Sequence, residues 1–407
     1  MIDERNADTA MYPFKWFFND CLWLEDKIIF PDSNCNAICE TDIKTGSTRI
    51  VCIVNEDEER LLFHGIYKWK EWLILPARNA ASGLHLFNLE NRKWDCITVE
   101  ENKKEWINFR GENVFEHNDC LYIFPLALVV LKVDIGKKSI DYIFYPEKEP
   151  ESDLRGEVAF IGNTVYIPVK HSKKIYKFNL AFEKWEVIEV NTELKGIDTL
   201  CYDGRQFWMS GVGKMICSWN EEENVSVSYK NFPRGFCKLE TINECAARDK
   251  EDGWWFGRSF WYGKSIYFIP GDANMLIVFD TEKKDMKELP IEGEEETRES
   301  LGQEGRFSTI KYMVAKQRDN LLMMLSNKNK NLVLLDVDTK KTQITDLKIC
   351  SETEMERIAS SRQMVGEGMI NLRVWLKNVI SNENQCGIHE PGEAAGKKIY
   401  SFNQIRE

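Results

Sequence analysis

Apolar and polar residues alternate along most of this chain in short stretches that are separated by polar turns. A period of two is typical of strands with one buried face, and the helical period of 3.6 is absent from most of the sequence. One unit recurs: a short strand, a tight turn rich in Gly, Asn and Asp, and an aromatic or aliphatic second strand. Its turns and second strands occupy residues 25–31, 70–76, 118–125, 162–168, 204–211, 263–271 and 318–326.

A second hairpin follows each of these units. Its first strand ends in Asp or Asn, and a charged turn then leads into a fourth strand. A short polar side chain at that place accepts hydrogen bonds from the turn backbone, so we expect the same turn in every repeat. The seven residues are Asp42, Asn88, Asp134, Asn179, Asn220, Asp280 and Asp336.

Four antiparallel strands repeated about every 42 to 59 residues are typical of propeller blades. The sequence therefore predicts an all-β, seven-bladed β-propeller of four-stranded antiparallel blades over residues 12–350. Such an array can exceed the size of one compact core, because each blade contacts only its neighbours. The means of ring closure stays open: residues 10–13 add to the last blade, or no donated strand is needed.

The second strand Ser265–Gly271 and the pairing of Tyr176 with Trp185 carry a family resemblance. The repeats resemble those of the kelch and galactose-oxidase central-domain propellers over roughly residues 12–350. Proline stands where kelch repeats have a Gly–Gly doublet, as at Pro31 and Pro76. The resemblance implies the architecture and no particular activity. The Tyr and His ligands and crosslinked Cys of a galactose-oxidase copper site have no counterpart.

Charge and composition exclude several classes of partner. The chain has 407 residues and a formal net charge of −12, which disfavours nucleic-acid binding through long-range repulsion of phosphates. The first ten residues lack the basic and apolar regions of a signal peptide, and no apolar run is long enough to cross a membrane. We therefore expect a cytoplasmic protein with no membrane partner. The 12 cysteines are scattered, which favours buried thiols and predicts neither a metal site nor a cofactor.

Two long connections interrupt the repeat, at residues 231–257 and 291–308. Both join a fourth strand to the next first strand, so they lie on the same face of the predicted disc. The first contains Trp254, Trp255 and Phe256, and the second contains an acidic run at Glu292–Glu296. The aromatic residues either cap the blades or form a lid or partner surface.

Several cationic and aromatic residues are expected on that face. Converging cations suit a carboxylate, a phosphate or an acidic sugar. The alternative is that these arginines form ion pairs between adjacent blades, Arg110 with Glu112 and Arg155 with Glu157. The predicted ligand-binding residues are Arg78, Arg110, Arg155, His171, Trp254, Arg258 and Arg306.

Three functions follow from these features. The favoured one is a non-catalytic propeller that binds a protein partner or a small anionic or sugar-like ligand on the face of the long loops. The second is a carbohydrate-active lyase, epimerase or hydrolase that uses a rim Tyr, His64, His171, Glu112 or Glu157 as acid and base. The third is a scaffold that acts through residues 351–407, an expected helical extension that packs on the propeller or mediates self-association.

Overall fold

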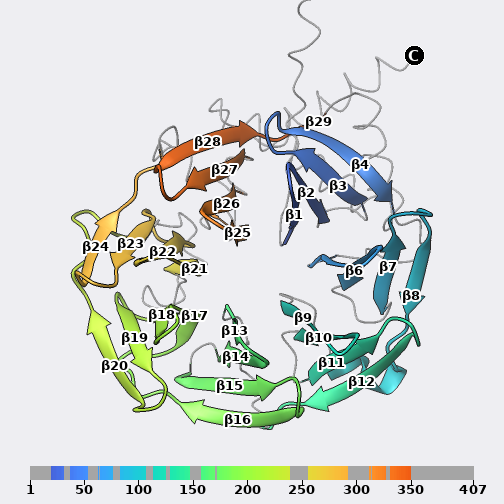
Figure 1. Cartoon of the computed structure of the whole chain (residues 1–407), viewed down its shortest axis with the longest axis horizontal. Helices are drawn as coiled ribbons and strands as arrows, with labels where there is room; N and C mark the ends of the chain where they lie inside the picture. The colour runs from blue at the N-terminus through green and yellow to red at the C-terminus, as the bar shows by residue number, and fades with distance from the viewer. Residues whose placement is uncertain are drawn as a thin grey trace, which may run out of the picture.

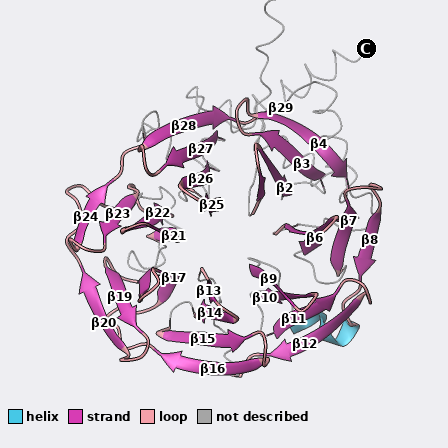
Figure 2. Cartoon of the chain, viewed as in Figure 1, coloured by secondary structure: helices cyan, strands magenta, loops and turns pink. Residues whose placement is uncertain are grey.

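The chain forms a closed ring of seven β-sheets, as the repeat predicts (Figure 1). We analysed a computed structural model, which describes residues 20–31, 37–53, 63, 65–76, 83–106, 113–124, 129–146, 157–169, 172–238, 255–291, 311–312, 314–326 and 331–349. In this part of the chain the only helical segment is the 3₁₀ helix η3 (Glu101–Trp106), between blades two and three (Figure 2). Neighbouring strands within each blade are antiparallel, and the order in each follows the sequence.

The first four blades contain the following strands. Blade one has β1 (Leu22–Leu24), β2 (Lys27–Pro31), β3 (Ala37–Asp42) and β4 (Ser47–Ile53). Blade two has β5 (Tyr67–Trp69), β6 (Trp72–Pro76), β7 (Leu84–Asn88) and β8 (Trp94–Ile97). Blade three has β9 (Asn113–His117), β10 (Cys120–Phe124), β11 (Val129–Asp134) and β12 (Ser139–Phe144). Blade four has β13 (Ala159–Ile161), β14 (Thr164–Pro168), β15 (Lys174–Asn179) and β16 (Lys184–Glu189).

The last three blades repeat this pattern. Blade five has β17 (Ile197–Tyr202), β18 (Phe207–Gly211), β19 (Ile216–Asn220) and β20 (Val225–Tyr229). Blade six has β21 (Phe256–Tyr262), β22 (Ser265–Pro270), β23 (Ile277–Asp280) and β24 (Asp285–Glu288). Blade seven has β25 (Val314–Arg318), β26 (Leu321–Ser326), β27 (Asn331–Asp336) and β28 (Lys341–Asp346), and β29 (Lys348–Ile349) follows it.

First strands surround the axis of the ring and fourth strands form its rim (Figure 1). Second strands such as β2 and β14 are almost wholly buried, whereas the outer strands β12 and β16 alternate between exposed and half-buried residues. Adjacent blades share the apolar clusters between them, as blades four and five do around Trp219. The core therefore consists of layers between blades. Cys21, Cys39, Cys201 and Cys217 are buried in these layers as free thiols.

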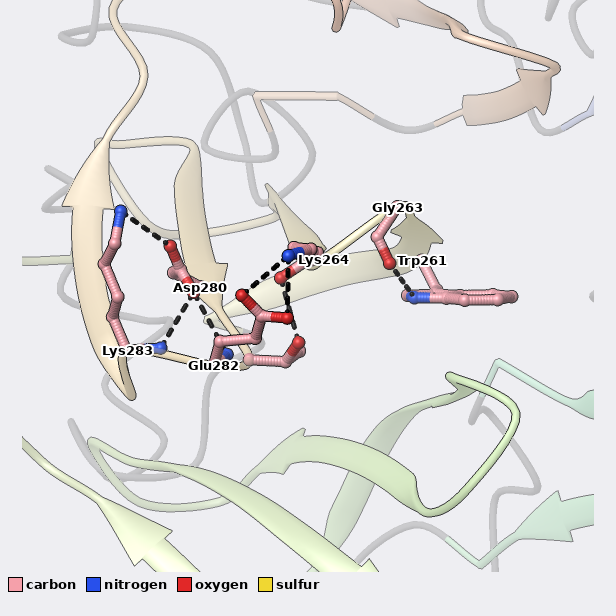
Figure 3. Close-up of polar contacts among 7 residues, drawn as sticks. Trp261, Gly263, Lys264, Asp280, Glu282 and Lys283 are labelled. Carbon is pink, nitrogen blue, oxygen red and sulfur yellow. Dashed lines mark hydrogen bonds and ion pairs between the residues drawn. The ribbon is translucent and has the colours of Figure 1, made fainter.

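The recurring Asp or Asn has the predicted role in all seven blades. In blade six, Asp280 Oδ1 accepts hydrogen bonds from the backbone N–H groups of Glu282 and Lys283 at 3.0 and 2.9 Å (Figure 3). The residue four positions later has a left-handed backbone, as at Lys284 (φ 56°), which a type I turn followed by a bulge requires. The same side-chain acceptor operates at Asp42, Asn88, Asp134, Asn179, Asn220 and Asp336.

The ring closes through the segment that follows blade seven. Strand β29 pairs in parallel with the outer edge of β4, so the sheet of blade one has five strands. Gly46 (φ 72°) accepts a hydrogen bond at 2.8 Å from the backbone N–H of Lys348. Near the axis, Arg318 of blade seven donates to the carbonyls of Trp23 and Glu25 and lies 4.3 Å from the centre of the Trp23 ring. The alternative closing segment, residues 10–13, lies outside the described residues.

Tyrosines of the second strands join neighbouring blades. Tyr122 donates to Glu183 Oε1 at 2.8 Å, and Lys132 reaches the same oxygen at 2.6 Å. Burial and this carboxylate raise the pKa of Tyr122 to about 12. Tyr166, Lys177 and Glu221 repeat the arrangement between blades four and five. The recurring second-strand tyrosine therefore has a structural role.

Candidate functional site

Three charged residues hold equivalent positions around the axis. Arg258 lies four residues before the end of β21, Glu157 lies four before the end of β13, and Asp20 lies four before the end of β1. Each first strand ends at the same kind of hairpin, so this count places the three side chains at one level of the ring. The level is near the disc face where first strands begin, which we call the loop face. The opposite face, which carries the hairpin turns, we call the turn face.

Glu157 links three blades. Its backbone N–H donates to the carbonyl of Asp198 in blade five at 3.0 Å. Its Oε2 accepts hydrogen bonds from Ser259 of blade six, at 2.6 Å from the backbone N–H and 3.1 Å from Oγ. Because β21 is an innermost strand, its edge toward the axis has no partner strand. The Glu157 carboxylate accepts a hydrogen bond from one of the backbone N–H groups on that edge.

Bulges in two first strands produce this contact. The register of β17 with β18 shifts between Ile197 and Thr199, and that of β21 with β22 shifts between Phe256 and Arg258. A bulge turns a strand locally and re-aims its backbone and side chains, and such features are common beside functional sites. Here the bulges place Asp198 and Ser259 within reach of Glu157.

The surroundings of Glu157 raise the pKa of its carboxyl group. Burial raises the pKa of Glu157 to about 7, although the positive charge of Arg258 and the hydrogen bonds from Ser259 act in the opposite direction. Burial and the nearby Glu157 charge also raise the pKa of the Cys201 thiol. At neutral pH the carboxyl group is therefore about half protonated, while the thiol stays protonated.

Arg258 differs from its charged neighbours. Its side chain makes no hydrogen bond or ion pair with any residue that the structure describes, and it acts on Glu157 only through space. Lys316, by contrast, forms an ion pair with Asp20 at 2.6 Å, and Asp20 also accepts the backbone N–H of Cys21 at 2.8 Å. A half-buried guanidinium offers up to five N–H donors in a planar fork that fits carboxylate and phosphate groups.

Of the seven residues predicted to bind a ligand, only Arg258 belongs to the described part of the chain. The structure places it on the innermost strand β21, where it forms no ion pair with a described residue. The ion pairs considered above, Arg110 with Glu112 and Arg155 with Glu157, each involve an arginine outside the described residues. The acid–base candidate Glu157 lies beside it. The remaining candidates lie outside the described residues: Arg78, Arg110, Arg155, His171, Trp254 and Arg306, together with His64 and Glu112.

Reading the sequence for cations and histidines missed Asp20, Ser259 and Lys316. Asp20 shares the strand position of Glu157 and Arg258, so counting back from each first hairpin would have found it. Ser259 gives no such signal, because its role depends on the bulge beside Gly257 and on a contact between residues 102 positions apart.

Aromatic residues of the connection between blades five and six pack against one another. The rings of Phe232 and Phe236 stack at 4.2 Å, and Phe236 lies 5.1 Å from Trp255. Phe236 and Phe256 are buried in the cluster of blades five and six. In the described part of this connection the aromatics therefore cap the blades, the first of the two predicted roles.

The comparisons with known proteins support the fold alone. The sequence matches no protein-family model and no curated protein. The computationally designed Ika8 protein is similar in structure, with a TM-score of 0.51, 8% identity, and coverage of 83% of this chain and 90% of that one. PorZ, an essential bacterial surface component of the type-IX secretion system of Porphyromonas gingivalis, has a TM-score of 0.52 and 8% identity. That match covers 84% of this chain but only 39% of PorZ.

The residues that the structure describes contain no helix that is long and apolar enough to span a membrane. They also contain no group of three or more His, Cys, Asp and Glu side chains arranged to hold a metal ion.

Proposed function

We propose that this chain is a recognition propeller that binds a small anionic ligand, a carboxylate, phosphate or acidic sugar, at the loop-face end of the axis. The observation that carries the proposal is Arg258, a half-buried guanidinium on an innermost strand that pairs with no described residue. Leaving such a group without a partner is costly in a folded protein, and a bound carboxylate or phosphate would supply two parallel hydrogen bonds.

Arg258 is the cation of this site that no described carboxylate neutralises through an ion pair. Lys316 and Asp20 neutralise each other in their ion pair. Glu157 carries about half a negative charge at neutral pH, because burial has raised its pKa to about 7. With Glu157 protonated, Arg258, Lys316, Asp20 and Glu157 together carry a net charge of about +1. The buried Asp198, whose backbone carbonyl accepts a hydrogen bond from Glu157, is a further acidic residue beside them.

A thermal-shift screen tests the proposal. The probes are inorganic phosphate, glucuronate, galacturonate and glucose 6-phosphate, each against glucose as the uncharged reference. We expect at least one anion to raise the melting temperature of the wild-type chain and to leave Arg258→Gln unchanged. Arg205→Gln is the matched control, because Arg205 is exposed in a hairpin turn on the opposite face. An equal shift in wild type and Arg258→Gln would contradict the proposal.

A carbohydrate-active enzyme is the second candidate, and one observation favours it. A carboxyl group whose pKa is about 7 suits general acid–base catalysis at neutral pH. Its hydrogen-bond partner is Ser259, however, and not a second titratable group, which favours binding without bond chemistry. Turnover of acidic oligosaccharides that is abolished by Glu157→Gln would establish the enzyme instead.

The finer parts of this proposal rest on the sequence. They are a kelch-like or galactose-oxidase-like ancestry and a cytoplasmic location. A protein partner is the alternative ligand. The C-terminal extension at residues 351–407 is proposed to pack on the propeller or to mediate self-association. If the chain binds a protein partner and Arg258→Gln does not weaken that binding, the binding surface lies on the long loops instead.

A further inference from the structure

Strand β20 differs from the other outer strands of the ring. Each of the other described outer strands contains at least one charged residue, such as Asp95 in β8 and Asp141 in β12. The sequence of β20 is Val-Ser-Val-Ser-Tyr, with no charge. Charged side chains on an edge strand oppose pairing with another molecule, and their absence leaves the edge open to it.

The side chains of β20 also expose apolar surface. Val225 and Val227 are 49% and 51% exposed, and they lie on the same face of the sheet because they are two residues apart. No described strand pairs with the outer edge of β20. The ring itself shows that such an edge can accept a strand, since β29 pairs with the outer edge of β4.

The hairpin fixes which backbone groups of β20 point outward. In blade two, the same turn closes with a hydrogen bond from Asn88 N–H to the Lys93 carbonyl. The equivalent pair in blade five is Asn220 with Val225. Hydrogen-bonded and non-hydrogen-bonded pairs alternate along an antiparallel ladder. The backbone groups of Val225 and Val227 therefore form hydrogen bonds with β19. The backbone N–H and C=O groups of Ser226 and Ser228 point away from the blade.

Charges at the two ends of β20 are complementary. The exposed Glu222 and Glu223 precede the strand, and the exposed Lys230, which forms an ion pair with Glu193 at the surface, follows it. A second copy of β20 that runs antiparallel brings the acidic end of each strand to the basic end of the other. A partner strand in parallel orientation would place like charges together.

We propose that two copies of this chain associate through antiparallel pairing of their β20 strands. Ser226 of each copy pairs with Ser228 of the other through their outward-facing backbone groups. Val227 then lies on the two-fold axis opposite its own copy, in a non-hydrogen-bonded pair whose side chains are close. Val225 lies opposite Tyr229 of the second copy. The surface is independent of the proposed anion site.

Sedimentation equilibrium of the full chain tests the dimer. We expect a concentration-dependent dimer for the wild type. In Val227→Lys, two like charges oppose each other on the axis, and we expect the dimer to weaken at least tenfold, or by about 1.4 kcal/mol. Phe144→Lys is the matched control, because Phe144 is 44% exposed on the outer strand β12. It should leave the dimer unchanged.

Disulfide trapping tests the register. Val227→Cys should link to itself across the two-fold axis under mild oxidation, and Val225→Cys should not, because its opposite residue is Tyr229. The wild-type chain measures the background from its own cysteines. A wild type that stays monomeric at every concentration overturns the proposal. So does a dimer that Val227→Lys does not weaken, or equal trapping of the two cysteine variants.

Discussion

Replacing Glu157 by Gln should remove a pH dependence from the stability of the protein. The pKa of Glu157 is raised from 4.5 to about 7 by burial. Between these two values the folded chain keeps a proton that the unfolded chain has lost, so stability falls as pH rises. This rise of about 2.5 in the pKa corresponds to at most about 3 to 4 kcal/mol, since one pKa unit is worth about 1.4 kcal/mol.

The assay is urea unfolding of wild type and Glu157→Gln at several pH values. We expect the free energy of unfolding of the wild type, relative to the variant, to be highest below about pH 4.5 and to decline until slightly above about pH 7. Glu222→Gln is the control, because Glu222 is exposed in a turn, and its curve should parallel that of the wild type. Parallel curves for Glu157→Gln and the wild type would show that folding does not raise the pKa of Glu157, and a slope of opposite sign would mean that the folded chain stabilises the ionised carboxylate.

Four further substitutions test the ring and its turns by urea unfolding. Gly46→Ala should cost at least about 2 kcal/mol, because an added Cβ would lie 1.8 Å from the carbonyl oxygen of Asp346 at the closure. Gly162→Ala, at φ 61° with no atom within 4 Å of the added Cβ, should cost only about 1 kcal/mol, and equal losses would argue against a close contact at the closure. Lys340→Gly should gain about 0.5–1 kcal/mol by relieving a left-handed backbone at φ 56°, and a loss would contradict the turn assignment. Arg318→Lys should cost about 1–2 kcal/mol, because it loses the two carbonyl contacts and the stacking on Trp23 that join blades seven and one, and no loss would mean that the closure does not depend on them.

The repeated parts of the fold could be predicted from the sequence because they depend on local chemistry. Asp280 and its six equivalents bond backbone groups two or three residues away, so the signal is contained in each hairpin. The second strands are buried on both faces and read as continuous apolar runs. The seven-bladed architecture follows from repeating these two local patterns.

The closure and the candidate site depend on contacts between distant blades, and the sequence carries little signal for them. Strand β29 has two residues, Lys348 and Ile349, which is too short for any alternation to appear. Glu157 meets Ser259 only because the ring curves and two first strands bulge. The sequence singled out Arg258 and Glu157 by residue type, but it did not predict that Arg258 would act on Glu157 through space while pairing with no described residue.

The most direct test of the central claim, that Arg258 holds an anion at the axis, is isothermal titration of glucuronate and of inorganic phosphate into the full chain near pH 6. There Glu157 is largely protonated, because its pKa is about 7. We expect saturable binding of at least one of the two anions at a single site, and we expect this binding to be weakened at least tenfold in Arg258→Gln and unchanged in Arg205→Gln. No binding of either anion, or equal binding by wild type and Arg258→Gln, would contradict it.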